Sequence, residues 1–276
     1  MDPAKLDPGD TLRRLISGMI GAAIVVALVL LGGLWFMVGM MIVFGIASLE
    51  YVHLMARQGH RVFGGLLLLW LALFFMTRGQ LGGFSMILLM VITVAWTLVR
   101  YQQGAQEAFL GLMLTLGGAF YFGWMASHFV AVRAFPDGAW WVMSIFLMGA
   151  GADVVAYFMG GWFGRHPLMP SISPSKSWEG YIGSILIGSL WGGALMLLWP
   201  LLGAGDTLAL QHGLILGAAI AAVSPLGDLN ISILKRYAGV KDSSKLIPGH
   251  GGFLDRTDNM VIAVLVAYTY LIEVVI

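Results

Sequence analysis

Residues 208–226 read LALQHGLILGAAIAAVSPL, and residues 227–258 continue as GDLNISILKRYAGVKDSSKLIPGHGGFLDRTD. The first stretch has no Asp, Glu, Lys or Arg and is close to the roughly 20 residues that a helix needs to cross a bilayer. The second stretch carries four acids and five Lys or Arg residues. Charged side chains are costly beside an apolar span, so this density needs a functional reason. We interpret the second stretch as a phosphate and metal site.

Composition supports an integral membrane protein. Apolar residues make up 59% of the 276 residues, only 11% are charged, and the absence of cysteine excludes disulfides and thiolate metal sites. We predict an all-α, polytopic helical bundle of about nine transmembrane helices with a cytoplasmic N-terminus. We expect the second and third spans to be short, and tilted or partly buried. The predicted spans are 15–32, 34–49, 63–77, 82–99, 105–126, 139–158, 181–202, 208–226 and 258–275.

The distribution of basic residues predicts the orientation. If the N-terminus is cytoplasmic, the outer loops hold only Arg78 and Arg133 of the 15 Lys and Arg residues, as the positive-inside rule requires. Both polar loops, 159–180 and 227–257, then face the cytoplasm, where nucleotides are available, and the C-terminus lies on the far side. No clear cleavage motif follows the polar segment Met1–Arg14, which predicts a retained first helix rather than a removed signal peptide.

The apolar spans leave little sequence for a separate soluble domain. We predict that residues 1–140 form a transmembrane scaffold and that residues 141–276 form the catalytic region with both cytoplasmic loops. The chain has 38 glycines, which suit close packing of helices within one chain and would also suit a homodimer. Glu50 and Tyr51, at a cytoplasmic helix end, are interpreted as structural.

The spacing of polar residues after residue 226 predicts a shared helix face. Asp228, Ser232, Lys235 and Arg236 stand at i, i+4, i+7 and i+8, so a helix over 227–237 would point them in one direction. Farther on, Asp255 and Asp258 are spaced i, i+3 at the mouth of the last span. If that segment is helical, their two carboxylates reach one hard cation. Oxygen ligands without clustered His or Cys favour magnesium over zinc.

The segment between these acids supplies cations and flexible backbone. Lys241 and Lys245 are available for phosphate contacts, and the run PGHGG over residues 248–252 lets backbone amides approach an anion. For each lysine alone, attraction to anionic lipid explains its position equally well. For the three aspartates the corresponding alternative is much weaker, because acids at a cytoplasmic membrane face repel an anionic surface. We therefore expect the aspartates to be ligands.

A second polar segment, residues 159–180, permits two interpretations. Asp153, near the cytoplasmic end of span six, either pairs with Lys176 or Arg165 or faces the nucleotide, and we favour the pairing. Ser177 is expected to cap span seven, and Pro174 fits a turn at the helix entry. We expect Trp178 to be an interfacial anchor rather than a base-stacking platform.

The polar motifs together resemble those of the phosphatidate cytidylyltransferases, also called CDP-diacylglycerol synthases. The resemblance rests on SILKR (232–236), KDSS (241–244) and LIPGHGGFLDRTD (246–258), and further on ADVVAY (152–157), FGR (163–165) and ISPSKSWEG (172–180). These motifs cover the C-terminal half, whereas residues 1–140 match only in hydropathy. The resemblance identifies the chain as a member of that family.

The resemblance implies transfer of cytidylyl from CTP to phosphatidic acid in a bacterial inner membrane, with the active site facing the cytoplasm. It implies that Asp228, Asp255 and Asp258 hold Mg²⁺, with a second cation left open, and that Lys235, Arg236, Lys241 and Arg256 bind phosphates. Both substrates are then partners, and no nucleic acid is expected. Predicted to contribute to substrate binding are Ser173, Lys176, Ser224, Ser232, Asp242, Lys245, His250, Gly251 and Gly252.

The chain departs from the family pattern at three positions. Ile231 replaces an acid that usually follows the Gly-Asp-Leu segment by three residues, Ser175 replaces a lysine, and Gly161 replaces a common arginine. Three other functions therefore remain as alternatives. These are a CTP-dependent lipid kinase, a catalytically silent homologue and a lipid transporter. A transporter would be expected to show charges at midspan or matching halves, and neither is visible in the sequence.

Overall fold

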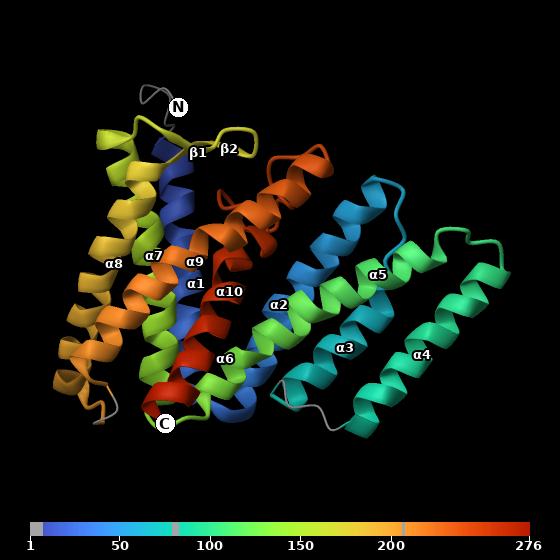
Figure 1. The fold of residues 1–276 in the computed structure, drawn as a ribbon, viewed down its shortest axis with the longest axis horizontal. Coiled ribbons are helices and arrows are strands. Elements are labelled where there is room, and N and C mark those ends of the chain that lie inside the picture. The colour runs from blue at the N-terminus through green and yellow to red at the C-terminus, as the bar shows by residue number, and fades with distance from the viewer. Residues whose placement is uncertain (1–7, 79–82, 206–207) are drawn as a thin grey trace.

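The computed structural model describes residues 8–78, 83–205 and 208–276, so part of the polar N-terminal segment lies outside the described residues. Nearly all of the described chain is helical, and one short antiparallel hairpin interrupts the helices (Figure 1). The elements are α1 (Pro8–Leu31), α2 (Gly33–Arg57), α3 (Gly64–Met76), α4 (Gly83–Gln102), α5 (Ala108–Gly118), η2 (Ala119–Met125), α6 (Ala126–Arg133), α7 (Gly138–Phe163), β1 (Pro167–Met169), β2 (Ser173–Ser177), α8 (Trp178–Leu198), η3 (Trp199–Leu202), α9 (Leu210–Tyr237), α10 (Leu254–Tyr270) and η4 (Leu271–Val275).

The predicted set of apolar spans is confirmed. Within the described residues, seven helices are long and apolar enough to cross a membrane, and two shorter apolar helices, Ile16–Leu31 and Gly64–Met76, account for the first and third predicted spans. The third span is short as predicted, with 13 residues in α3. The second predicted span was also expected to be short, and this prediction is wrong, because α2 has 25 residues. Its polar residues Glu50 and His53 shortened the apolar run that the sequence displays, but they did not end the helix.

Large apolar side chains cover the outside of the bundle. On α4, Phe84, Ile87 and Leu98 are each more than half exposed. In water this surface would be strongly unfavourable, whereas hydrocarbon chains solvate it. The chain is therefore an integral membrane protein, and α4 lies at the edge of the bundle in Figure 1.

Glycines allow the C-terminal helices to pack at close range. A Cβ atom on Gly192 of α8 would collide with the carbonyl oxygen of Gly213 on α9, and one on Gly217 would collide with that of Gly188. Small residues bring two helix backbones together in this way without polar side chains. The α8–α9 pair packs against α10 through α9, and α7 packs on α8.

The polar connections gather at one end of the bundle. The β1–β2 hairpin, the N-terminal end of the described chain and the α9–α10 connection lie at that end, and the C-terminus lies at the opposite end (Figure 1). The predicted helix over 227–237 is confirmed, because α9 runs to Tyr237. The α9–α10 connection is therefore shorter than the predicted loop 227–257, and the predicted loop 159–180 contains the end of α7 and the hairpin.

Candidate active site

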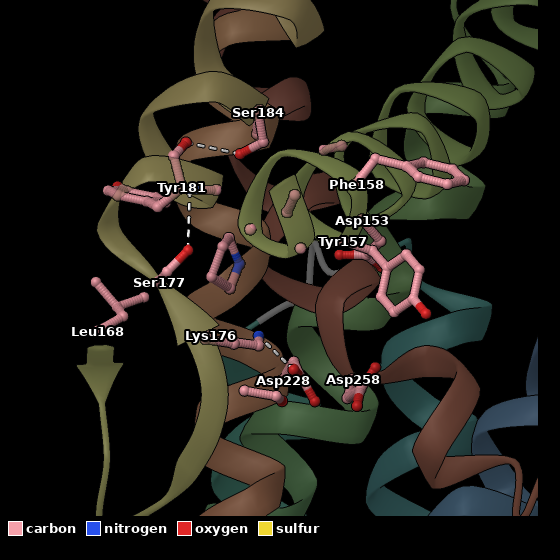
Figure 2. A pocket seen from close by; sticks show the side chains of 18 of the residues that line it. Asp153, Tyr157, Phe158, Leu168, Lys176, Ser177, Tyr181, Ser184, Asp228 and Asp258 are labelled. Atoms are coloured by element: carbon pink, nitrogen blue, oxygen red, sulfur yellow. Dashed lines mark hydrogen bonds and ion pairs between the residues drawn. The ribbon is translucent and has the colours of Figure 1, made fainter. Parts of the chain in front are cut away.

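A cavity of about 790 Å³ opens between α7, the hairpin, α8, α9 and the start of α10. Lys176, Asp228 and Asp258 lie together at one side of it, and Asp153 of α7 also lines it, beside Tyr157 (Figure 2). Every lining residue falls between positions 152 and 258. The cavity therefore joins the two polar segments that the sequence singled out.

Lys176 reaches the cavity from β2 and forms an ion pair with Asp228 of α9. The hairpin that carries Lys176 is fixed at its base by Glu179, which accepts hydrogen bonds from the Arg165 and His166 amides (3.1 and 3.3 Å) and contacts His166 Nδ1 at 2.6 Å. Ser177 accepts a hydrogen bond from the Gly180 amide and caps α8, as predicted. The local sequence thus positions one cation opposite one carboxylate.

Asp258 reaches the same place because α9 and α10 approach each other closely at Gly227. A Cβ atom on Gly227 would collide with the carbonyl oxygen of Asp258. The same carbonyl accepts a hydrogen bond from the Tyr121 hydroxyl at 3.0 Å, which fixes the backbone from the other side. Only glycine at position 227 allows this contact, and Asp228 follows it directly.

Replacing Gly227 with Ala is expected to separate the two helices and to destabilise the protein by about 1–3 kcal/mol, the usual cost of overpacking. A lower melting temperature in detergent, measured by nanoDSF, would test this. Gly149→Ala is the matched control, since a Cβ atom there meets nothing within 4 Å and alanine favours a helix. Equal melting temperatures for Gly227→Ala and wild type would contradict the close approach.

The side chains of Asp228 and Asp258 both line the cavity, and the two carboxylates are close enough to affect each other electrostatically. Two neighbouring carboxylates with low exposure repel each other unless a proton or a cation lies between them. Lys176 contacts Asp228, while Asp258 is only 7% exposed and receives a hydrogen bond from the Asn259 amide at 2.8 Å. The oxygen-only donor set fits a hard divalent cation.

Asp255 is held apart from this pair. It accepts a hydrogen bond from Lys235 Nζ at 2.6 Å, and others from the amide and hydroxyl of Ser243, both at 2.8 Å, and from the Gly252 amide at 3.0 Å. Within the described residues, no group of three or more His, Asp or Glu side chains is arranged to hold a metal. In the glycine-rich segment, the Gly252 amide thus binds the carboxylate of Asp255, a group of the protein itself.

The contacts of Glu50 with the loop before α10 were not predicted from the sequence. Glu50 comes from α2, is 5% exposed, and accepts a hydrogen bond from the Ser244 hydroxyl at 2.6 Å. The Ser243 hydroxyl lies 3.0 Å from Glu50 and is shared with Asp255. Glu50 also accepts hydrogen bonds from the backbone amides of Phe253 and Leu254 at 3.1 and 2.8 Å, where α10 begins. These contacts hold the loop beside Asp255, which is compatible with the structural role expected from the sequence. An acid within an apolar span was the available signal.

Replacing Glu50 with Gln is expected to lower activity roughly tenfold and to reduce thermal stability, because hydrogen bonds to a charged group contribute about 1.5–3 kcal/mol each. The glutamine amide would face backbone donors and leave some of them unsatisfied. Turnover and melting temperature should be measured on the same preparation. Glu273→Gln, in η4 at the far end of the chain, is the control. Unchanged turnover in Glu50→Gln would show that the loop holds its position without this anchor.

Aromatic side chains form the outer part of the cavity. Tyr157, Phe158 and Trp162 of α7 line it, and they are 77%, 48% and 73% exposed. Asp153 lies beside them and accepts a hydrogen bond from Asn259 Nδ2 at 2.6 Å, with Lys176 nearby (Figure 2). The cavity is thus polar on one side and aromatic on the other, an arrangement that suits an amphipathic ligand.

The predicted site residues fall into two groups. Those that line the cavity are Lys176, Asp228, Asp255, Arg256 and Asp258. Those that do not line it are Ser173, Ser224, Ser232, Lys235, Arg236, Lys241, Asp242, Lys245, His250, Gly251 and Gly252. His250 is turned toward α1, where its Nδ1 lies 2.9 Å from the Ser17 hydroxyl. Lys241 and Lys245 are exposed, which is compatible both with binding a substrate phosphate and with attraction to anionic lipid.

A family model described as the cytidylyltransferase family matches residues 12–274, nearly the whole chain. The chain belongs to the cytidylyltransferase family. Within this family, the polar cavity formed by α7, the hairpin, α8, α9 and α10 is the candidate site for a nucleotidyl transfer. Proteins of this family use CTP, which generally implies a divalent cation, and the paired carboxylates Asp228 and Asp258 fit one.

Several bacterial relatives are named phosphatidate cytidylyltransferase. The Mycobacterium leprae protein is 34% identical, with 91% of this chain and 84% of the relative covered. The Synechocystis protein is also 34% identical, with 94% and 96% covered. The Bacillus subtilis protein is 30% identical, with 91% and 93% covered. The family model also covers residues 12–140, which the sequence motifs alone did not reach.

Proposed function

We propose that the protein is a phosphatidate cytidylyltransferase, which converts CTP and phosphatidic acid into CDP-diacylglycerol and pyrophosphate. One observation carries this proposal: the adjacent carboxylates of Asp228 and Asp258, paired with Lys176, lie in a cavity whose other side is aromatic and exposed. Membership in the cytidylyltransferase family and the names of the relatives support it.

The reaction brings two anions together. An oxygen of the lipid phosphate forms a bond to the α-phosphorus of CTP, and the bond from that phosphorus to the oxygen bridging to the β-phosphorus breaks, releasing pyrophosphate. The nucleophile is already an ionised phosphate, so no protein nucleophile is required. The protein has to position both phosphates and neutralise their charge. Lys176 and Arg256, which line the cavity, are placed to do so.

We assign Asp228 and Asp258 as the residues that would hold Mg²⁺. Magnesium is usually bound by one or two protein carboxylates together with substrate phosphates and water, so a third carboxylate is not needed. When bound, Mg²⁺ would neutralise charge on the transferring phosphoryl group. Asp255 would become a third ligand only if Lys235 broke its ion pair with Asp255 and bound a substrate phosphate instead. Lys235 would then be available for the phosphate and Asp255 for the metal.

Phosphatidic acid would enter from the membrane, with its phosphate toward Lys176 and its acyl chains along the aromatic side. Tyr157, Phe158 and Trp162 on α7 support this route, because they are exposed where lipid would contact them. We place the cavity at the cytoplasmic face of a bacterial inner membrane, where CTP is available. The distribution of Lys and Arg supports that orientation.

Ile231 does not remove a ligand from this cavity. Its side chain is 3% exposed and packs in the hydrophobic core, and it is absent from the cavity lining. An acid there would need its own partner in the core, so its replacement by isoleucine is compatible with an active enzyme. This favours activity over a catalytically silent homologue.

We assign the chemistry to residues 141–276, which contain the whole cavity lining, and a supporting role to residues 1–140. The exposed Arg236, Lys241 and Lys245 would meet the CTP phosphates outside the cavity, and two copies of the chain would associate through residues 1–140. Residues 1–140 also contribute directly to the catalytic region, because Glu50 of α2 holds the loop before α10.

Two labelled nucleotides test the function directly. The purified protein is incubated with phosphatidic acid, Mg²⁺ and CTP labelled at either the α- or the γ-phosphate, and the lipids are extracted. The proposal predicts label in lipid from α-labelled CTP only. Lipid label from γ-labelled CTP would instead identify a kinase, and a folded protein that labels no lipid would refute the proposal.

A further inference from the structure

A second cavity, also of about 790 Å³, lies on a different part of the molecule. It is formed by the end of α2, the connection to α3, the start of α3 and the end of α4, and it shares no lining residue with the first cavity. The α2–α3 connection and the end of α4 lie at the same end of the bundle as the β1–β2 hairpin (Figure 1). The second cavity is therefore at the end of the bundle where the polar connections gather.

The charged side chains that line this cavity are basic. Arg61 and Arg100 line it together with His60, and no Asp or Glu is among the lining residues. Arg100 Nη1 donates to Gln103 Oε1 at 3.0 Å, while the Arg61 side chain is exposed and forms no hydrogen bond or ion pair with the described part of the chain. Arginine beside a concave surface is well suited to a phosphate, because its planar donors can bind two oxygens at once.

His60 adds a second observation that points to a ligand. Its Nε2 lies 2.6 Å from the Tyr237 hydroxyl, whereas its Nδ1 is buried and has no hydrogen-bond partner in the described structure. The Glu107 carboxylate is 3.6 Å from Nδ1, beyond hydrogen-bonding distance. Buried polar atoms normally find a partner, so a phosphate oxygen at this side of the cavity would accept a hydrogen bond from Nδ1 in the tautomer that carries the ring proton there.

The start of α3 contributes backbone charge. Its first turn has no side-chain cap, and Gly64 and Gly65 line the cavity. A Cβ atom on Gly65 would meet nothing within 4 Å, so the space in front of these residues is open. An uncapped helix N-terminus carries a partial positive charge, which adds to that of the two arginines.

The remaining wall is apolar and partly exposed at the outside of the bundle. Val52, Leu66 and Trp96 line it, and Trp96 is 48% exposed on α4, the helix at the edge of the bundle. A soluble anion would use only the basic half of such a cavity, whereas a phospholipid would fill both halves. Basic pockets between transmembrane helices at a membrane surface bind acidic headgroups by this arrangement.

We propose that the cavity between α2, α3 and α4 binds an anionic phospholipid, with its phosphate at Arg61 and Arg100 and an acyl chain along Trp96. This lipid site is separate from the proposed site of cytidylyl transfer. It would hold a lipid of the surrounding membrane through turnover rather than consume it.

Native mass spectrometry of the detergent-purified protein tests the proposal. Wild type, Arg61→Gln/Arg100→Gln and the control Arg57→Gln/Arg78→Gln are each titrated with phosphatidylglycerol, phosphatidylcholine and inorganic phosphate. The control removes the same charge, and neither of its residues lines the cavity. We expect the cavity variant alone to bind phosphatidylglycerol about tenfold more weakly, the loss of roughly one charged hydrogen bond.

Three results would overturn the proposal. These are equal phosphatidylglycerol binding by the cavity variant and the control, equal binding of phosphatidylcholine by wild type, and displacement of the lipid by an equal concentration of inorganic phosphate. The last result would identify a soluble-anion site. Arg61→Gln alone, at an exposed position, serves as the second variant if the double variant unfolds. Because no turnover is measured, these outcomes do not depend on whether cytidylyl transfer is confirmed.

Discussion

Replacing Asp228 with Asn is expected to lower the rate of cytidylyl transfer roughly 10²–10³-fold, the usual effect of removing one strong electrostatic contact to a reacting phosphoryl group. Asparagine keeps the size of the side chain and its carbonyl still accepts from Lys176, but the negative charge beside Asp258 is lost. The rate should be measured at saturating CTP, so that the effect on turnover is separated from that on binding. Asp258→Asn is expected to behave alike.

Asp137→Asn is the matched control for both variants. Asp137 precedes α7 at the end of that helix away from the cavity, and it accepts a hydrogen bond from the Gly205 amide at 2.9 Å, which asparagine can also accept. Its φ of 54° is a conformation that asparagine tolerates. The control should retain wild-type turnover. If Asp228→Asn retains it too, Asp228 does not take part in the transfer.

Removal of divalent cations is expected to abolish lipid labelling, because two carboxylates and two substrate phosphates then repel one another. Treatment with EDTA should bring the activity to background, and added Mg²⁺ should restore it. In Asp258→Asn, the Mg²⁺ concentration that gives half-maximal rate should rise, because one charged ligand is missing. A titration of rate against free Mg²⁺ measures both effects.

A simple ionic effect can be separated from a bound cation. Sodium chloride at matched ionic strength is the control, since monovalent salt screens exposed charges but does not bind two carboxylates tightly. Restoration of full activity by sodium chloride in EDTA would contradict a divalent site. The same half-maximal Mg²⁺ concentration in wild type and Asp258→Asn would place the cation elsewhere, for example on the nucleotide alone.

Much of the fold could be predicted from the sequence, because hydropathy reports directly on membrane spans. The nine predicted spans correspond to α1, α2, α3, α4, α5 to α6, α7, α8, α9 and α10. The helix over 227–237 and the Ser177 cap also follow from local spacing and chemistry. Such features depend on residues within a few positions of one another.

The candidate site was only partly predictable, because its geometry depends on distant contacts. Nothing near Asp255 indicated that Lys235, Ser243 and Gly252 would enclose it and separate it from Asp258. Glu50 lies 193 positions before Ser243, a residue of the loop that Glu50 holds. The hairpin that brings Lys176 to Asp228 was likewise predicted only as a turn at a helix entry.

The most direct test of the central claim is the mass of the lipid that the protein makes. Purified wild type and Asp258→Asn, shown to have equal melting temperatures, are incubated with CTP, Mg²⁺ and one synthetic phosphatidic acid, and the extracted lipids are analysed by mass spectrometry. We predict that wild type forms CDP-diacylglycerol with the same acyl chains and that Asp258→Asn forms almost none. A pyrophosphorylated or unchanged lipid from wild type, or equal product from both proteins, would contradict cytidylyl transfer at this cavity.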